Sequence, residues 1–226
     1  MSAKYAPKTA FGWAVHHAEE TAIAVTLGVM TLITFVNVVL RYVFAHSMIW
    51  GLEATLILFA WLVLLGMSYA VKVTAHLGVD AVLGLVGPGM RRILAIASAV
   101  LCLIYAFLLL KGAWDYWAPF GGFEQTGGRW FPEGFIKTRD QAWYETETIP
   151  MPDWLRFIEG PMNQGEAYNK LPRFIPYFIL PFGTALLFFR IAQASWDILR
   201  GRREALIVSH EAEEAVAEVR RMNAED

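Results

Sequence analysis

Four long runs without Asp, Glu, Lys or Arg constrain this chain more than any other feature. They cover residues 21–40, 54–71, 93–110 and 174–189, and are 20, 18, 18 and 16 residues long. As α-helices, which rise about 1.5 Å per residue, they would be about 24–30 Å long. The hydrocarbon core of a bilayer is about 30 Å thick. The runs therefore predict an all-α membrane protein with four transmembrane helices.

Composition favours a membrane protein over a soluble one. Of the 226 residues, 56% are hydrophobic and only 18% are charged. The net charge of −2 supplies no basic field, so nucleic acid is not an expected partner. Cys102 is the one cysteine and lies in an apolar run, which excludes an internal disulfide and a cysteine-rich metal site.

Lysine and arginine residues predict the orientation of the helices. Two lie before the first run, one in the first connection, three in the second connection and four in the 14 residues that follow the fourth run. They are Lys4, Lys8, Arg41, Lys72, Arg91, Arg92, Arg190, Arg200, Arg202 and Arg203. Because positive charge accumulates in cytoplasmic connections, we expect both termini in the cytoplasm and the long third connection in the periplasm.

The chain is thus divided into four parts. Residues 1–110 hold an N-terminal segment and three helices, 111–173 the periplasmic connection, 174–200 the fourth helix, and 201–226 a cytoplasmic tail. Pro181 lies inside the fourth helix, where it removes a backbone donor and should kink the helix or need help from a neighbour.

The third connection contains glycine pairs, several prolines and many aromatic residues. Its tryptophans are Trp114, Trp117, Trp130, Trp143 and Trp154. Disordered linkers are poor in aromatic residues, so we expect an ordered segment of short strands and turns. Two interpretations remain open, an interfacial lid with tryptophans at headgroup depth or a surface that docks a partner.

The uncharged runs contain no carboxylate or histidine that could carry a charged solute. Ion and proton paths need such groups near the bilayer midplane. The polar residues present are Thr26, Thr31, Thr34, Asn37, Thr55, Ser68, Ser98 and Thr184, which suit hydrogen bonds between helices. Motifs of enzymes and phosphate-binding loops are also missing. We therefore expect a membrane scaffold without a catalytic, substrate-binding, metal or cofactor site.

Residues at the ends of the first two helices are candidates for structural or subunit-interface roles. Asn37 and Arg41 share a helix face, and Trp50 and Glu53 open the second helix. Arg41 and Glu53 should lie at one membrane surface, where an ion pair would join the two helices. Trp61 lies deeper in the second run.

Lys72, His76 and Asp80 are spaced by four and should line one stripe on the cytoplasmic side. His76 is an alternative haem or metal ligand, but haem would need a second histidine facing it. The other histidines, at 16, 17, 46 and 210, lie outside the uncharged runs. A haem site is therefore not favoured.

The ordered set of these segments resembles a known family. The chain reads Asn-Val-Val-Leu-Arg-Tyr at 37–42, Trp-Gly-Leu-Glu at 50–53, Phe-Ala-Trp-Leu-Val-Leu-Leu-Gly at 59–66 and Lys-Val-Thr-Ala-His-Leu-Gly-Val-Asp at 72–80. With Ile-Leu-Pro-Phe-Gly at 179–183, it is similar to the small membrane subunit of tripartite ATP-independent periplasmic (TRAP) transporters, of the DctQ-like type.

That resemblance implies a four-helix inner-membrane subunit with two protein partners. One is a large permease that holds the substrate and sodium sites, and the other is a periplasmic substrate-binding protein. It implies sodium-coupled uptake of C4-dicarboxylates or related organic acids, with this subunit as a non-catalytic scaffold among membrane lipids. The alternative from a different class is a membrane anchor of a quinone-linked oxidoreductase, and a membrane hydrolase is more remote.

Two features depart from the family pattern. Leu52 stands where many members have the first of two acids, so only Glu53 remains. Residues 118–171 look like an insertion in a loop that is usually shorter. We expect this insertion to dock a partner outside the membrane through Trp130, Trp143 and Trp154.

Overall fold

Four helices long and apolar enough to cross a membrane dominate the structure. The computed structural model describes residues 10–73, 87–132, 134–135 and 144–201. The candidate spans are Gly12–Val43, Ile49–Lys72, Gly89–Gly121 and Phe174–Leu199. They confirm the predicted four-helix membrane protein.

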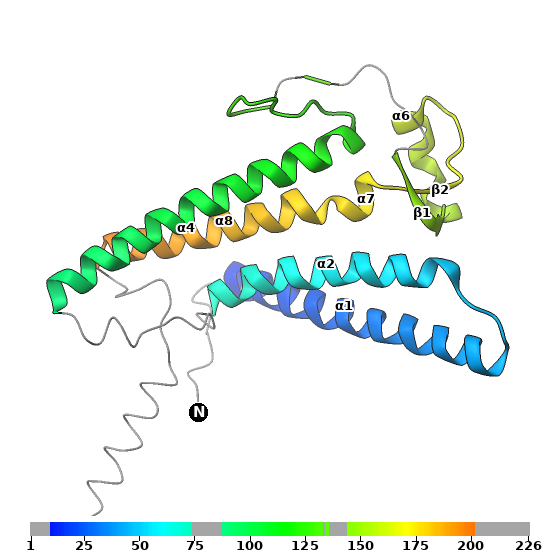
Figure 1. Cartoon of the computed structure of the whole chain (residues 1–226), viewed down its shortest axis with the longest axis horizontal. Helices are drawn as coiled ribbons and strands as arrows, with labels where there is room; N and C mark the ends of the chain where they lie inside the picture. Colours follow the sequence, from blue (N-terminus) through cyan, green and yellow to red (C-terminus); the bar gives the residue numbers. More distant parts are fainter. Residues whose placement is uncertain (1–9, 74–86, 133, 136–143, 202–226) are drawn as a thin grey trace, which may run out of the picture. The chain divides into compact units, whose positions relative to one another are not determined.

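In the described residues the elements are six α-helices, two 3₁₀-helices and one pair of strands (Figure 1). In order they are α1 (Ala10–Val43), α2 (Ile49–Lys72), α4 (Pro88–Trp117), η1 (Ala118–Gly121), β1 (Glu145–Pro150), η2 (Asp153–Ile158), α6 (Glu159–Asn163), β2 (Lys170–Pro172), α7 (Phe174–Tyr177) and α8 (Ile179–Leu199).

The helices extend beyond the uncharged runs. α1 begins at Ala10, so His16 and His17 lie in it rather than outside the spans, and α4 continues past Lys111 and Asp115 to Trp117. Long polar side chains near a helix end can reach the membrane surface while the backbone stays helical. A run that stops at the first charged residue therefore underestimates helix length.

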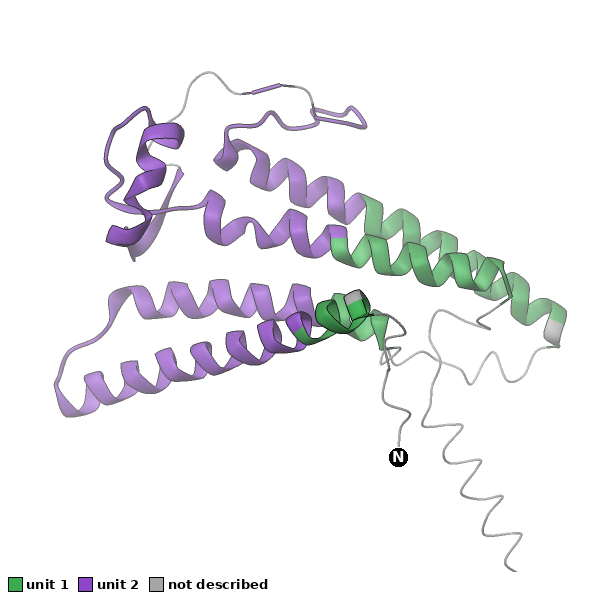
Figure 2. Cartoon of the chain, turned by 180° about the vertical axis from the view of Figure 1, so that it is seen from behind, with its two compact units in different colours: residues 1–17, 67–107, 186–226 green, residues 18–66, 108–185 purple. Residues whose placement is uncertain are grey.

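Contacts divide the chain into two units, which Figure 2 colours separately. In the unit formed by 1–17, 67–107 and 186–226, α4 and α8 pack through small residues: Ala95 and Ala99 form a buried cluster with Ile198. Small side chains let membrane helices approach closely. In the same unit, the ring of His16 stacks on Tyr69 with centroids 5.7 Å apart.

The other unit, 18–66 and 108–185, contains the α1–α2 hairpin and the insertion. The Asn37 side-chain oxygen accepts a hydrogen bond from the backbone N–H of Met48 (3.0 Å), which fixes the hairpin turn. At Gly183, α8 approaches α2 so closely that an added Cβ would lie 2.7 Å from the Cβ of Leu64.

The fourth span is broken, as Pro181 predicted. α7 ends at Tyr177 and α8 begins at Ile179, with Phe178 between them. Pro181 has no N–H to donate to the carbonyl of Tyr177, so the regular hydrogen-bond ladder cannot continue there. The consequence is a one-residue interruption of the α-helix at Phe178, whose N–H donates to the carbonyl of Ile175.

The insertion contains short elements, which agrees with the expected strands and turns. β1 pairs with β2 in antiparallel fashion, with Glu145 opposite Pro172 and Pro150 opposite Lys170. A register irregularity lies between these two pairs. An isolated bridge joins Phe123 to Phe135.

Candidate functional site

The Glu53 carboxylate fastens the insertion to α2. Its Oε1 accepts a hydrogen bond from the backbone N–H of Glu147 (3.0 Å). Its Oε2 accepts hydrogen bonds from the N–H (2.7 Å) and the hydroxyl (2.6 Å) of Thr148. Hydrogen bonds to an ionised acceptor are about twice as strong as neutral ones. We call this group of contacts the Glu53 anchor.

The predicted ion pair between Arg41 and Glu53 is wrong. Within the described part of the chain, Arg41 is exposed and forms no ion pair with Glu53. The backbone and hydroxyl of β1 take the place that the sequence gave to Arg41. Asn37 and Trp50 are half-buried, and Asn37 acts at the hairpin turn.

A second group of contacts ties the insertion to the end of α4. Asp115 accepts hydrogen bonds from the N–H (2.6 Å) and hydroxyl (2.7 Å) of Thr126. Lys111 donates to Asp115 (3.3 Å) and to the Thr126 hydroxyl (2.6 Å). The sequence offered a signal for the Lys111–Asp115 pair, which is spaced by one helical turn, but none for Thr126.

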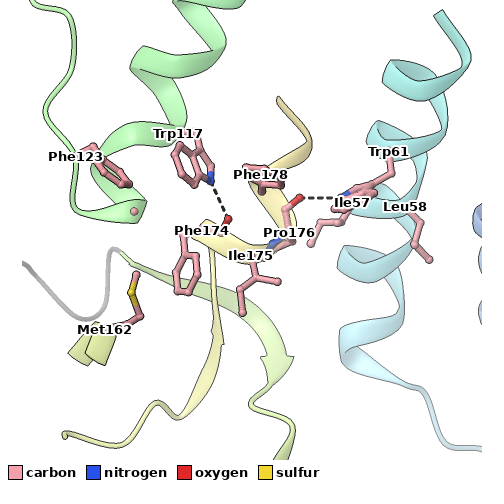
Figure 3. Close-up of a pocket in the computed structure, with 11 residues that line it drawn as sticks. Ile57, Leu58, Trp61, Trp117, Phe123, Met162, Phe174, Ile175, Pro176 and Phe178 are labelled. Atoms are coloured by element: carbon pink, nitrogen blue, oxygen red, sulfur yellow. Dashed lines mark hydrogen bonds between the residues drawn. The ribbon is translucent and has the colours of Figure 1, made fainter. Parts of the chain in front are cut away.

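Two tryptophans donate to backbone carbonyls just before the break. The indole N–H of Trp61 donates to the carbonyl of Pro176, and that of Trp117 donates to the carbonyl of Phe174, both at 2.8 Å (Figure 3). Irregular backbone at membrane depth is tolerated when neighbours satisfy it. Trp61 was a predicted structural residue, whereas Trp117 was not singled out for a role.

An apolar cavity of about 670 Å³ lies beside these two bonds. Its walls come from α2, from the segment after α4, from α6 and from α7 (Figure 3). The lining residues are Ile57, Leu58, Trp61, Trp117, Gly121, Phe123, Met162, Phe174, Ile175, Pro176 and Phe178.

The insertion has its own polar framework. Glu145 accepts from the N–H of Asn169 (3.0 Å), and Arg173 donates from Nε to the carbonyl of Glu145 (2.6 Å). Arg156 pairs with Asp153 and Glu159, and the hydrogen bond to Asp153 is the main cause that raises the pKa of its guanidinium. The segment around β1 and β2 is therefore held together by its own residues.

The tryptophans predicted to dock a partner are exposed where the structure describes them. Trp130 is 73% exposed and Trp154 is 75% exposed. Trp143 lies outside the described residues. Phe131 and Phe157 are similarly exposed, so each described tryptophan has an exposed aromatic residue nearby in sequence.

The predicted cytoplasmic stripe is described only at its start. Lys72 is buried, and His76 and Asp80 lie outside the described residues. In the ranges that the structure describes, no group of three His, Cys, Asp or Glu side chains is placed to hold a metal ion.

Five threonine hydroxyls of the spans bond within their own helices, not between helices as the sequence suggested, whereas the buried Ser68 hydroxyl has no hydrogen-bond partner among the described residues. Each threonine hydroxyl donates to the carbonyl four residues earlier, at 2.6–2.9 Å. The residues are Thr26, Thr31, Thr34, Thr55 and Thr184. Such bonds satisfy the hydroxyl locally.

Comparison with known proteins shows that this sequence is similar to transporter components. A family model described as "Tripartite ATP-independent periplasmic transporters, DctQ component" matches residues 30–138. The chain is 44% identical over 196 residues to the C4-dicarboxylate TRAP transporter small permease protein of Vibrio cholerae, covering 87% of this chain and 77% of that one. A Pseudomonas aeruginosa protein of the same description is 28% identical over 225 residues, covering 88% and 90%.

Proposed function

Since this chain belongs to the DctQ family of TRAP transporter small permeases, we propose that it is a non-catalytic scaffold subunit for sodium-coupled uptake of C4-dicarboxylates. Its partners are a large permease subunit in the inner membrane and a periplasmic substrate-binding protein. The proposed substrate class follows the descriptions of the Vibrio cholerae and Pseudomonas aeruginosa relatives. The family membership argues against the alternative of an oxidoreductase anchor.

One observation carries the scaffold role: two carboxylates near the helix ends and five threonines in the described spans form hydrogen bonds within the chain itself. Glu53 and Asp115, near the ends of α2 and α4, accept hydrogen bonds from the insertion. The hydroxyls of the threonines named above donate to their own helix. A translocation path needs polar groups that can exchange partners with a solute. Transport would then be performed by the large subunit.

Reconstitution tests this division of labour. We expect this chain alone in sealed vesicles to take up no labelled C4-dicarboxylate under a sodium gradient, even with the binding protein present. The large permease together with this chain and the binding protein should take it up. Uptake by the chain alone, or full uptake by the permease without this chain, would contradict the proposal.

We also propose that the insertion receives the binding protein through the exposed aromatic residues around Trp130 and Trp154. Large exposed aromatic side chains are enriched at protein interfaces. Trp130→Ala and Trp154→Ala should raise the concentration of loaded binding protein needed for half-maximal uptake. Trp13→Ala removes a tryptophan that is 57% exposed near the start of α1 and is the matched control. Deleting residues 120–168 without effect on transport and assembly would refute this role.

A further inference from the structure

The lining of the cavity beside α7 is apolar and does not favour polar ligands. None of its lining residues is charged. Its two indole N–H groups already donate to the carbonyls of Pro176 and Phe174. Water or a polar ligand would therefore find few hydrogen-bond partners on the lining of this cavity. Its volume of about 670 Å³ is nevertheless in the range of sites that bind small molecules.

The position of the cavity along α2 determines which part of a membrane lipid could enter it. Ile57 and Trp61 come four and eight residues after Glu53, the charged residue that precedes the uncharged run of α2. At about 1.5 Å per residue they lie about 6 and 12 Å beyond it along that helix. Half of the hydrocarbon core is about 15 Å thick, so this wall is at the depth of lipid acyl chains.

The opposite wall is formed by the end of α4 and by residues of the insertion, which lie near the membrane surface. Trp117 is the last residue of α4, while Gly121, Phe123 and Met162 follow it outside the long helices. Gly121 keeps this wall compact, because an added Cβ would lie 3.0 Å from the Phe123 ring and 3.2 Å from the Trp117 ring. The cavity thus extends from the surface toward the middle of the bilayer.

We propose that one acyl chain of a membrane phospholipid, from the leaflet next to the insertion, occupies this cavity. The chain is recognised by its hydrocarbon and not by its headgroup, because the lining offers contacts but no charge. The lipid then completes the packing between α2, the broken helix and the insertion. It is a structural ligand, separate from the solute that the transporter moves.

Photo-crosslinking tests the proposal with the chain in complex with its large permease in lipid nanodiscs. The probe is a phospholipid with a diazirine midway along one acyl chain, supplied with phosphatidylethanolamine or phosphatidylglycerol headgroups. We expect crosslinks to concentrate on peptides that contain Ile57 to Trp61 and Phe174 to Phe178. Both headgroups should give the same yield.

Two neighbouring leucines provide a matched pair of variants. Leu58 lines the cavity, whereas Leu56 is 61% exposed and does not. Leu58→Phe should fill part of the space and lower the crosslink yield about tenfold, the effect of displacing about two buried methylene groups. Leu56→Phe should leave the yield unchanged. Ile175→Ala enlarges the cavity and should keep or raise the yield, which separates occupancy from misfolding.

Three results would overturn the proposal. The first is crosslinks spread evenly over the exposed faces of all four spans. The second is an unchanged yield in a Leu58→Phe variant that still assembles with the permease. The third is a permease peptide, and no lipid, captured by a photoreactive residue placed at Ile57, since a protein segment would then fill the cavity.

Discussion

The carboxylate of Glu53 accepts three hydrogen bonds from β1, while Arg41 is exposed and forms no ion pair with it in the described chain. A carboxylate near the membrane surface needs donors once it is partly removed from water. Backbone N–H groups meet that need without a second charge. The residue therefore works as an anchor for the insertion and not as a staple between α1 and α2.

Removing the Glu53 acceptor should loosen β1. In Glu53→Ala, the amides of Glu147 and Thr148 lose their partner, which we expect to cost about 2 kcal/mol for hydrogen bonds to a charged group. Their hydrogen exchange should accelerate about thirtyfold if local opening limits it. The measurement is exchange followed by mass spectrometry on the purified complex. Arg41→Ala is the control and should not change it; acceleration in Arg41→Ala would restore the ion-pair interpretation.

Gly183 and Gly66 should respond in opposite ways to a methyl group. The added Cβ of Gly183→Ala meets the Cβ of Leu64 at 2.7 Å, so α8 and α2 must separate, at a cost of about 1–3 kcal/mol. Gly66→Ala meets nothing within 4 Å and should gain up to about 1 kcal/mol from helix propensity. Thermal unfolding in detergent would distinguish them; equal shifts would show that the close approach has no energetic weight.

At the scale of elements, the break between α7 and α8 is where α2 and α4 are joined to the fourth span. Pro181 interrupts the ladder, and Trp61 and Trp117 bring donors from α2 and α4 to the carbonyls of Pro176 and Phe174. Each bond spans a long stretch of sequence. Three elements are thereby joined by two indoles.

Replacing either indole by a benzyl ring isolates these bonds. Trp61→Phe and Trp117→Phe keep most of the ring but leave a carbonyl without its donor, at about 1–3 kcal/mol each. We expect lower thermal stability for both variants. Trp196→Phe is the control, since Trp196 is 54% exposed on α8 and contacts Arg200 through its ring. A loss as large in the control would assign the effect to ring size and not to the N–H donor.

The sequence predicted the helices better than their contacts. Charge-free runs located all four spans, and Pro181 located the break, because both effects are local along the chain. The partners of Glu53 and Trp61 are 94 or more residues away, and nothing local marks Thr148 as a donor to Glu53 or Pro176 as the acceptor for Trp61. The predicted ion pair between Arg41 and Glu53 was wrong because, from the sequence alone, a nearby opposite charge is the simplest partner to expect for a carboxylate.

At the scale of the whole molecule, orientation decides which partner the insertion can meet. The predicted arrangement places both termini in the cytoplasm, on the evidence of lysine and arginine alone. Docking of a periplasmic protein requires this orientation. The predicted orientation places the termini and the insertion on opposite sides of the membrane, so one labelling experiment can test it.

Cysteine labelling can determine the orientation in a Cys102→Ser background, which removes the one native cysteine. In intact spheroplasts, a membrane-impermeant maleimide should label Glu166→Cys in the insertion and spare Ser2→Cys. Permeabilised cells should label both positions, which controls for accessibility. The reverse pattern in intact spheroplasts would place the insertion in the cytoplasm and end its proposed role in docking.

The hydrogen bonds within the spans also bear on the order of biogenesis. Five threonine hydroxyls are satisfied inside their own helices, so these groups need no later helix as the chain leaves the translocon. The indoles of Trp61 and Trp117 differ, because their acceptors belong to α7, which is synthesised after both. These two hydrogen bonds can therefore form only after the start of the fourth span has been synthesised, and a truncated chain that stops before residue 174 would leave both indole donors without their acceptors.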